Sequence, residues 1–445
     1  MTFENLNLIE PILKAVKLEG YTTPTPIQNL AIPIVLNKKD LLGIAQTGTG
    51  KTAAFSIPII QMLHQNEKSI NFKNRKIKAL ILTPTRELAI QVYDSVKTYS
   101  KYTNLRCGVL IGGVNQFSQV KELERGVDIL ISTPGRLLDL INQNYANINS
   151  VEYFVIDEAD RMLDMGFIHD VKMIVAELPK DRQTLFFSAT MPDEIAKLSS
   201  SILKNPEKVE IEPKVKTAEK VSQSVYFVDK GNKKALLVDI LKEVNTDRIL
   251  VFTRTKHGAN NLVQTLEKNK IQAQAIHSDK SQNARQTALN NFKAKITKVL
   301  IATDIASRGI DIDDLNLVIN YDIPNIPETY VHRIGRTGRA GASGHSISFC
   351  DAEEKEYLDE IQHLIGQEIP EVKNPNYVFT GEKASKSPNG KIDRRHSKNR
   401  GNSHTNATVR IATSEKPRSN SRNANNKKKA QGNATNSSSQ ARRRR

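Results

Sequence analysis

The sequence has little cysteine, no tryptophan and no long apolar run. Cys107 and Cys350 are its only cysteines, which excludes a disulfide framework and a four-cysteine zinc site. Both lie in apolar, strand-like surroundings and are expected to be inert core residues. No stretch approaches the roughly 18 uninterrupted apolar residues of a membrane-spanning helix. Residues 1–5 lack the basic region and apolar core of a secretory signal. We therefore expect a cytoplasmic protein without membrane contact, and a monomer.

Positive charge is concentrated at one end of the chain. The net charge is +17, but residues 381–445 hold 18 Lys or Arg against 3 Asp or Glu, so the remainder is nearly neutral. This basic tail has no Phe, Tyr or Trp. It cannot bury enough apolar surface to offset its chain entropy and is predicted to be disordered. A solvated tail is the plain interpretation. A nucleic-acid tether is the functional one, because cations on a phosphate backbone release counterions.

The rest of the chain alternates short apolar runs with amphipathic stretches. The runs are apolar or β-branched at nearly every position, which suits strands buried on both faces of a parallel sheet. They form two sets: Leu80–Thr83, Asp128–Ser132, Tyr153–Ile156 and Thr184–Phe187, then Ile249–Thr253, Ala273–His277, Lys298–Ala302, Leu317–Asn320 and His345–Phe349. Helical stretches such as 87–99 and 257–269 lie between them, so the fold class is α/β with two parallel-sheet domains in tandem. The predicted boundaries are 1–205 for the first domain, 206–220 for a linker, 221–370 for the second domain and 371–445 for the disordered tail.

A glycine-rich loop follows the apolar run 41–44 and opens a predicted helix over 52–63. It consists of Ala45, Gln46, Thr47, Gly48, Thr49, Gly50, Lys51 and Thr52, a phosphate-binding loop with Ala in place of the usual first Gly. Backbone N–H groups and the helix N-terminus favour phosphate oxygens. Lys51 would reach the β and γ phosphates, and the Thr52 hydroxyl would ligate Mg²⁺. A chance turn is the alternative, which the strand before and the helix after disfavour.

The acidic run 157–160 directly follows the predicted strand 153–156. A carboxylate at the carboxyl end of a parallel strand faces the ligand crevice. Asp157 would hold Mg²⁺ through its waters, and Glu158 would orient and deprotonate an attacking water. An ordinary acidic helix start is the alternative. Together with the phosphate loop, the run favours catalysis.

With these motifs in this order, residues 1 to about 370 resemble the DEAD-box ATP-dependent RNA helicases. The strings DEADRMLDMGFIHD (157–170) and VFTRTKHGAN (251–260) resemble the bacterial RhlE-type branch. The resemblance implies two RecA-like domains, with ATP and Mg²⁺ as cofactors and RNA bound through its backbone. It also implies that the binding of ATP and RNA closes the two domains on each other, and that RNA-stimulated hydrolysis of ATP to ADP and phosphate reopens them. Closure would open short RNA duplexes or remodel RNA–protein complexes, with the tail as an RNA tether.

The resemblance also implies further nucleotide contacts. Phe3, Tyr21 and Gln28 would lie at the base, where the Gln28 amide can pair with the adenine edge. Gly309 and Asp311 would approach the nucleotide from the second domain. Arg336 and Arg339 would reach the γ phosphate as arginine fingers. Ser278 and Ser307 replace a usual Gly and a common Ala, small changes that we expect to be tolerated.

An RNA groove and a coupling network are implied in the same way. The expected RNA-contacting residues are Pro84, Arg86, Gly113, Thr133, Pro134, Gly135, Arg136, Thr303 and Asp304. The hydroxyls of Ser188 and Thr190 would bond Asp160, and His332 and Arg333 would bridge to the first domain. Each arginine alone would more often be a helix cap or a surface ion pair. Several such turns along one sheet edge favour a groove.

Three functions remain open at this stage. The first is an RNA-dependent ATPase that opens short duplexes. The second is an RNA-binding chaperone in which the tail does the main work and ATP times release. The third is an ATP-dependent clamp within a larger RNA–protein assembly. The complete catalytic set favours the first, and partners in ribosome assembly, RNA decay or cold adaptation all suit this branch.

Overall fold

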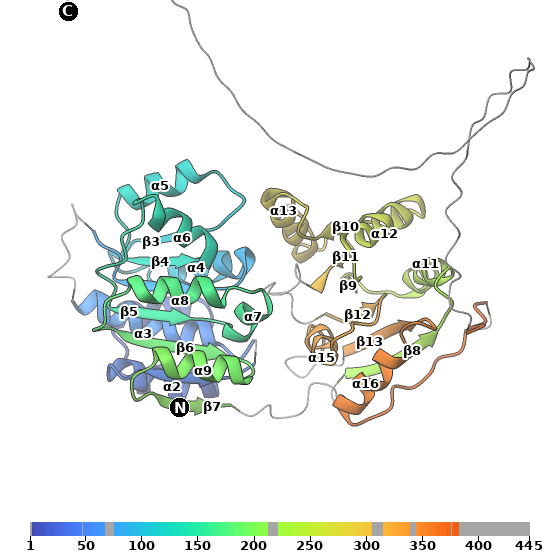
Figure 1. Cartoon of the computed structure of the whole chain (residues 1–445), viewed down its shortest axis with the longest axis horizontal. Helices are drawn as coiled ribbons and strands as arrows, with labels where there is room; N and C mark the ends of the chain where they lie inside the picture. The colour runs from blue at the N-terminus through green and yellow to red at the C-terminus, as the bar shows by residue number, and fades with distance from the viewer. Residues whose placement is uncertain are drawn as a thin grey trace, which may run out of the picture. The chain divides into compact units, whose positions relative to one another are not determined.

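The computed structural model describes residues 2–46, 48–66, 75–211, 221–304, 315–338, 344–374 and 376–381. In this part of the chain, two parallel sheets are formed by consecutive stretches of sequence, each with helices packed on it (Figure 1). The predicted α/β fold with two parallel-sheet domains is confirmed.

Within the described residues the first sheet has the strand order β3-β4-β2-β5-β6-β1-β7, and every neighbouring pair is parallel. Its strands are β1 Leu41–Ile44, β2 Ala79–Leu82, β3 Cys107–Leu110, β4 Ile129–Ser132, β5 Tyr153–Ile156, β6 Gln183–Ser188 and β7 Glu207–Glu210. Its helices are η1 Phe3–Leu6, α1 Glu10–Leu18, α2 Pro26–Leu36, α3 Lys51–Gln65, α4 Arg86–Tyr99, α5 Gln116–Glu124, α6 Pro134–Asn142, α7 Ala159–Asp164, α8 Ile168–Glu177 and α9 Asp193–Ile202.

The strands of this sheet are apolar on both faces because helices cover both. Ile81 and Val155 belong to the core shared with α2, α3 and α4. Leu80 and Phe154, one residue away on the same strands, belong to the opposite core with α6, α8 and α9. Successive strand residues point to opposite faces, so the near-continuous apolar runs of the sequence follow directly from two-sided burial.

The second sheet has the order β10-β11-β9-β12-β13-β8 among the described residues, again with parallel pairs. Its strands are β8 Val221–Phe227, β9 Ile249–Phe252, β10 Ala273–Ile276, β11 Val299–Ala302, β12 Leu317–Asn320 and β13 Gly344–Cys350. Its helices are α11 Lys233–Glu243, α12 Lys256–Lys268, α13 Gln282–Lys293, α15 Pro327–Ile334 and α16 Lys355–Ile365. Cys350 is buried in this sheet, and burial raises the pKa of its thiol to about 12.

Two predicted boundaries differ from the structure. Residues 207–210, assigned to the linker, form the edge strand β7 beside β1. Only Val209 of this strand is buried, so its sequence is too polar to be identified as a strand. Glu371 and Thr380, both assigned to the tail, still contact the second domain: Glu371 bridges to Val225, and the Thr380 hydroxyl donates to Asp229 at 3.0 Å.

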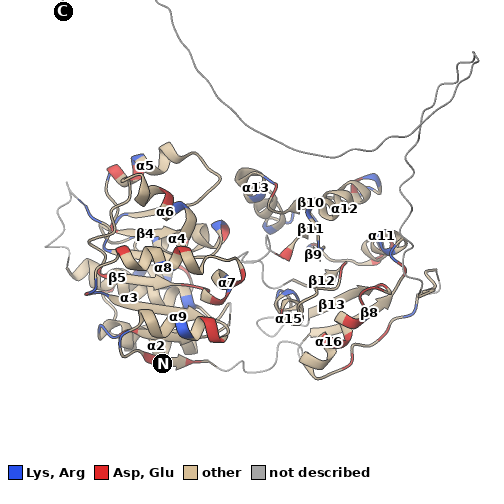
Figure 2. Ribbon diagram, in the orientation of Figure 1, with Lys and Arg blue, Asp and Glu red and all other residues tan. Residues whose placement is uncertain are grey.

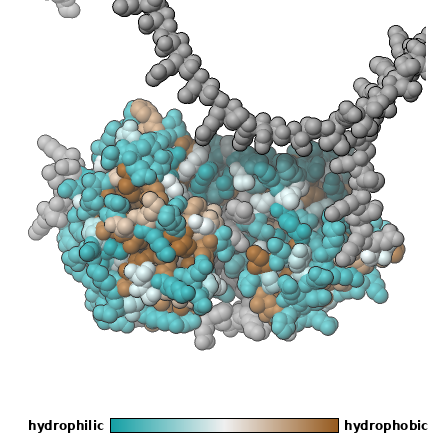
Figure 3. Space-filling view, in the orientation of Figure 1, coloured by the Kyte–Doolittle hydropathy of each residue, from teal (hydrophilic) through white to brown (hydrophobic). Residues whose placement is uncertain are grey.

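The described surface is mainly hydrophilic. Lys and Arg alternate with Asp and Glu over the helices (Figure 2), in keeping with a nearly neutral body. Apolar side chains appear in several places in Figure 3, among them the first domain, where Met173 of α8 is 43% exposed. Among the described helices, none combines the length and the apolar character needed to cross a bilayer.

Candidate nucleotide and nucleic-acid site

Three predicted motifs meet at the carboxyl ends of neighbouring strands in the first sheet. The phosphate loop follows β1 and the acidic run follows β5. Residues 188–190, called the coupling motif below, begin at the last residue of β6. The three strands are neighbours in the order β5-β6-β1. The backbone N–H of Ala45 donates to the carbonyl of Ser188 at 3.0 Å. The sequence therefore brings the phosphate loop, the acidic run and the coupling motif to one edge, the usual ligand site of a parallel sheet.

The phosphate loop is tightly folded at the start of α3. Lys51 is 6% exposed, and its Nζ donates to the carbonyl of Ala45 at 2.8 Å. Gly50 has φ of 92°, and a Cβ there would overlap the Gln28 amide nitrogen. Glycine is thus required at this position by both backbone conformation and space. Thr47 lies outside the described residues.

Asp157 is buried with one oxygen unsatisfied. It is 2% exposed, and its Oδ1 has no hydrogen-bond partner. Burial raises the pKa of Asp157 to about 6, the neighbouring Glu158 charge adds to the rise, and the Lys51 charge opposes it. A buried carboxylate oxygen without a donor, beside a phosphate loop, fits a site for the waters of Mg²⁺. Thr52, predicted to be a ligand, is the second residue of α3 at the same edge.

This burial predicts a pH-dependent stability cost. The Asp157 pKa is higher in the folded than in the unfolded state, so the ionised form destabilises the nucleotide-free protein. Asp157→Asn should raise the free energy of unfolding by about 1–3 kcal/mol at pH 8, and the gain should vanish as the pH falls from 6 to 4. Denaturant unfolding at pH 8 and pH 4 measures both values. Equal gains at the two pH values would contradict this origin.

Asp160 is bonded to the coupling motif as predicted, with one difference. Its Oδ2 accepts from the Thr190 hydroxyl at 3.0 Å and from the Thr190 N–H at 2.9 Å. The Ser188 hydroxyl instead accepts from the Asp160 N–H at 3.2 Å and donates to the Thr190 carbonyl at 2.7 Å. Both hydroxyls thus fix the acidic run to the end of β6, Thr190 through the carboxylate and Ser188 through the backbone.

The residues predicted to contact the base lie in different environments. Both ends of the Gln28 amide are used within the protein: Oε1 accepts from the Thr25 N–H at 2.9 Å and Nε2 donates to the Gly50 carbonyl at 3.2 Å. Tyr21 is 43% exposed. Phe3, predicted to lie at the nucleotide, is only 4% exposed and packs in the core of the first domain. The structure therefore places Phe3 as a core residue.

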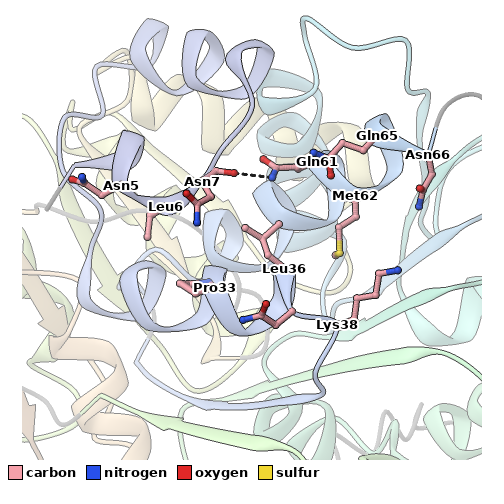
Figure 4. Close-up of a pocket in the computed structure, with 11 residues that line it drawn as sticks. Asn5, Leu6, Asn7, Pro33, Leu36, Lys38, Gln61, Met62, Gln65 and Asn66 are labelled. Carbon is pink, nitrogen blue, oxygen red and sulfur yellow. Dashed lines mark hydrogen bonds between the residues drawn. The ribbon is translucent and has the colours of Figure 1, made fainter.

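The segment that carries Phe3 is attached to α3 by Gln61. The Gln61 amide donates to the Asn7 carbonyl and accepts from the Ile9 N–H, both at 2.9 Å. A hollow of about 380 Å³ lies beside these bonds, lined by amide side chains, Lys38 and a few apolar residues (Figure 4). It lies at the C-terminal ends of α2 and α3, whereas Gln28 and Lys51 are at their N-terminal ends. It is therefore separate from the phosphate loop.

A second hollow, of about 520 Å³, gathers the predicted RNA-facing turns. Five predicted residues line it: Pro84, Arg86, Thr133, Gly135 and Arg136. Gly113 has φ of 76°, and a Cβ there would overlap the guanidinium of Arg86. Glycine at this position is therefore what lets Arg86 lie along the hollow. Pro134 starts α6 at the same edge and is buried.

Arg136 forms two long polar contacts within the first domain. Its Nε lies 3.7 Å from the Asp139 carboxylate in the next turn of α6, and its NH2 lies 3.5 Å from the Val114 carbonyl. Its NH1 is buried without a hydrogen-bond partner. An unsatisfied guanidinium donor in a hollow is available to a phosphate oxygen.

The second-domain motifs are organised differently from the prediction. Arg333, expected to bridge to the first domain, is 2% exposed and binds both carboxylate oxygens of Asp304, at 2.6 and 2.8 Å. It also donates to Asn320 and to the Asp322 carbonyl. Arg333 thus fixes Asp304 within its own domain, because a buried guanidinium needs all its donors satisfied.

The remaining second-domain predictions are placed only in part. Thr303 is buried at the end of β11, His332 is half-buried in α15, and Arg336 is buried just after that helix. Gly309, Asp311 and Arg339 lie outside the described residues. The roles of Arg336 and Arg339 as fingers stay predictions.

One cluster in the second hollow was missed at the sequence level. Glu87, 2% exposed at the start of α4, accepts from Gln282 and from Arg285, each at 2.9 Å. In the sequence Glu87 is an ordinary acid in the first turn of a helix. Its partners are almost 200 residues away, and no local pattern pairs them.

Two family models match the chain, the DEAD/DEAH box helicase model over residues 25–198 and the helicase conserved C-terminal domain over residues 232–341. The ATP-dependent RNA helicase DbpA of Bacillus subtilis is 41% identical over 84% of this chain and 77% of its own length. The ATP-dependent RNA helicase DeaD of Haemophilus influenzae is 40% identical over 86% of this chain, which spans only 61% of that relative.

Solved structures match both domains. S. cerevisiae Dbp5 bound to RNA and ADP BeF3 superposes with a TM-score of 0.73 and 30% identity, covering 83% of this chain and 95% of that one. The DEAD-box helicase Mss116 bound to single-stranded RNA and UDP-BeF gives a TM-score of 0.74 at 30% identity, covering 84% and 80%.

Proposed function

Because this chain belongs to the DEAD/DEAH box helicases, we propose that it is an RNA-dependent ATPase that uses ATP hydrolysis to separate short RNA duplexes. One observation carries the proposal. One sheet edge carries Lys51, the carboxylate of Asp157 with its unsatisfied oxygen, and the carboxylate of Glu158. Asp160 of the same acidic run is hydrogen-bonded to Thr190 of the coupling motif. That set suits a nucleoside triphosphate and an attacking water, and a binding protein without turnover has no need of it.

In the proposed reaction the phosphate loop binds the triphosphate. Its backbone N–H groups and the start of α3 contact phosphate oxygens, and Lys51 moves from the Ala45 carbonyl to the β and γ phosphates. Glu158 accepts a proton from the attacking water as the bond to the γ phosphorus forms. The γ phosphate leaves ADP, and the negative charge that develops is offset by Lys51 and the proposed arginine fingers.

Mg²⁺ fits this arrangement. Thr52 and Asp157 are the residues that would hold it, Asp157 through water. When bound, the ion offsets phosphate charge.

Coupling to RNA would pass through the bonds of Asp160. Thr190 and Ser188 connect the end of β5 to the end of β6, so a shift of the acidic run on ATP binding would move the coupling motif. If RNA and ATP both favour the same closed state of the two domains, each strengthens the binding of the other. A bent RNA backbone along Arg86 and Arg136 would exclude the complementary strand.

We extend the proposal to the branch of the family, the cellular location, the oligomeric state and the tail. We place the chain in the RhlE-type branch on the strings 157–170 and 251–260, although the relatives named above are DbpA and DeaD. We also propose that it acts in the cytoplasm as a monomer, and that its basic tail, residues 381–445, tethers RNA.

The tail proposal predicts a change in salt dependence. Truncation after Gly381 keeps the contacts of Glu371 and Thr380 with the second domain. The truncated chain should retain its RNA-stimulated hydrolysis at saturating RNA and lose RNA affinity, with a shallower log–log dependence on salt. Fluorescence anisotropy with a labelled single strand at several salt concentrations measures the slope.

A full-length control separates charge from length. In it, the tail keeps its length while its Lys and Arg are replaced by Gln. We expect this control to behave like the truncated chain. If the salt slopes of the intact and truncated chains coincide, the tail is no tether. If the truncated chain loses hydrolysis at saturating RNA, the chaperone alternative gains support.

A further inference from the structure

The mechanism above gives no role to Arg161, which forms a buried ion pair with Glu158 at the start of α7. NH1 of Arg161 donates to Oε2 of Glu158 at 2.6 Å, and the two side chains are 7% and 6% exposed. We propose that Arg161 is a positioning residue that orients the Glu158 carboxylate towards the attacking water. This inference rests on the proposed function, in which Glu158 is the base.

The backbone of Glu158 explains why its side chain meets Arg161. Glu158 has φ of 54° and ψ of 53°, a left-handed conformation that residues with a side chain seldom adopt. It is the residue just before α7, so Arg161 lies one helical turn later, at the spacing where side chains are neighbours. The pair forms within four consecutive residues and needs no other element. The contact is therefore local to the acidic run, whose Asp157 and Glu158 belong to the proposed site.

The ion pair also offsets the repulsion between two neighbouring carboxylates. Asp157 and Glu158 are adjacent buried carboxylates, 2% and 5% exposed, and like charges in such a setting repel. Lys51 offsets the charge of Asp157, and Arg161 is the cation that contacts Glu158. A guanidinium remains charged at any working pH and presents its donors in a fixed fork. Arg161 thus holds the Glu158 carboxylate at a set angle.

The contact leaves the other oxygen of Glu158 for the reaction. Among the described residues, no hydrogen bond is formed to Oε1 of Glu158. With Oε2 held by Arg161, rotation of the carboxylate is restricted, and Oε1 is the atom that accepts the proton. Loss of the guanidinium would leave the base present and free to rotate, which slows the chemical step more than it weakens ATP binding.

A buried ion pair can also be purely structural, so the test needs a matched control. Arg75 forms an ion pair with Asp128, with side chains 5% and 1% exposed, before the start of β4 and away from the phosphate loop. Breaking either pair leaves a buried carboxylate without its cation. Arg75→Met should therefore lower the melting temperature and leave the turnover number unchanged.

The experiment measures RNA-stimulated ATP hydrolysis by the full chain and its variants. Arg161→Met should lower kcat about tenfold, a fraction of the total effect of a general base, and change KM for ATP by less than about twofold. Arg161→Lys, which keeps the charge but lacks the planar fork, should recover part of the loss. Because Arg161 acts through Glu158, Glu158→Gln combined with Arg161→Met should be no slower than Glu158→Gln alone. If the Met variant does not fold, Arg161→Gln replaces it with the same expected loss.

Several outcomes would overturn the inference. These are a wild-type kcat in Arg161→Met, a full additional loss in the double variant, or hydrolysis without RNA that rises above the wild-type rate. Faster hydrolysis without RNA would mean that the ion pair with Arg161 inhibits Glu158. The proposed function fails separately, if the wild-type chain shows no RNA-stimulated hydrolysis or if Glu158→Gln hydrolyses ATP normally.

Discussion

Glu158→Gln should abolish measurable RNA-stimulated ATP hydrolysis, with kcat lowered at least 100-fold, while ATP still binds. Removal of a general base typically costs a factor of about 10²–10⁴. Gln keeps the size of Glu and an oxygen that accepts from Arg161, so the bond now seen at 2.6 Å has a substitute. The amide cannot take a proton from water at neutral pH. Single-turnover hydrolysis and fluorescent-nucleotide binding measure the two properties separately.

Glu177→Gln is the matched control for this variant. Glu177 is exposed at the end of α8 in the same domain, so the same chemical change there should leave hydrolysis at the wild-type rate. Normal hydrolysis by Glu158→Gln would show that another group activates the water. Loss of both hydrolysis and ATP binding would show that Glu158 supports the site's structure.

Lys51→Met should weaken ATP binding on the order of 10- to 100-fold and leave AMP binding almost unchanged. The ammonium of Lys51 is buried and held at the Ala45 carbonyl, 2.8 Å away, at the start of the helix that follows the phosphate loop. Hydrogen bonds to charged groups contribute about 1.5–3 kcal/mol each, and AMP lacks the β and γ phosphates that Lys51 is proposed to contact. Titration of each nucleotide by calorimetry gives both affinities.

Lys38→Met serves as the control, because Lys38 is exposed just after the C-terminal end of α2 and lines the hollow of Figure 4, which is separate from the phosphate loop. It should bind ATP and AMP as the wild type does. Equal losses of ATP and AMP affinity in Lys51→Met would mean that the substitution disrupts the loop. Unchanged ATP affinity would remove Lys51 from the site.

The fold could be predicted because each buried strand is recognisable from its own short sequence. Strands such as β2 and β5 are buried at every position, so their sequences are apolar throughout and stand out between polar turns. The edge strand β7 buries only Val209, and its sequence is indistinguishable from a linker. Burial on two faces therefore decides which strands can be recognised.

The nucleotide site was predictable for a related reason. Lys51, Asp157 and Glu158 lie within short motifs that directly follow strands, so sequence order alone brings them to one edge. The Thr190–Asp160 bond was also anticipated and is present.

Interactions between distant residues were not predictable in this way. The motif predicts that Arg333 reaches the first domain, whereas the structure shows its guanidinium bound to Asp304. Glu87 and Arg285 pair across 198 residues. Phe3 is in the core because Gln61 bonds the segment that follows it to α3. Each outcome depends on which partners tertiary packing places nearby, and no spacing rule contains that information.

The most direct test of the central claim is the rate of ATP hydrolysis by the full chain with and without single-stranded RNA. The same sequence as DNA is the control. An RNA-dependent ATPase should hydrolyse ATP slowly alone, much faster with RNA, and at nearly the unstimulated rate with DNA. RNA that binds without accelerating hydrolysis would contradict the account and favour an RNA-binding chaperone.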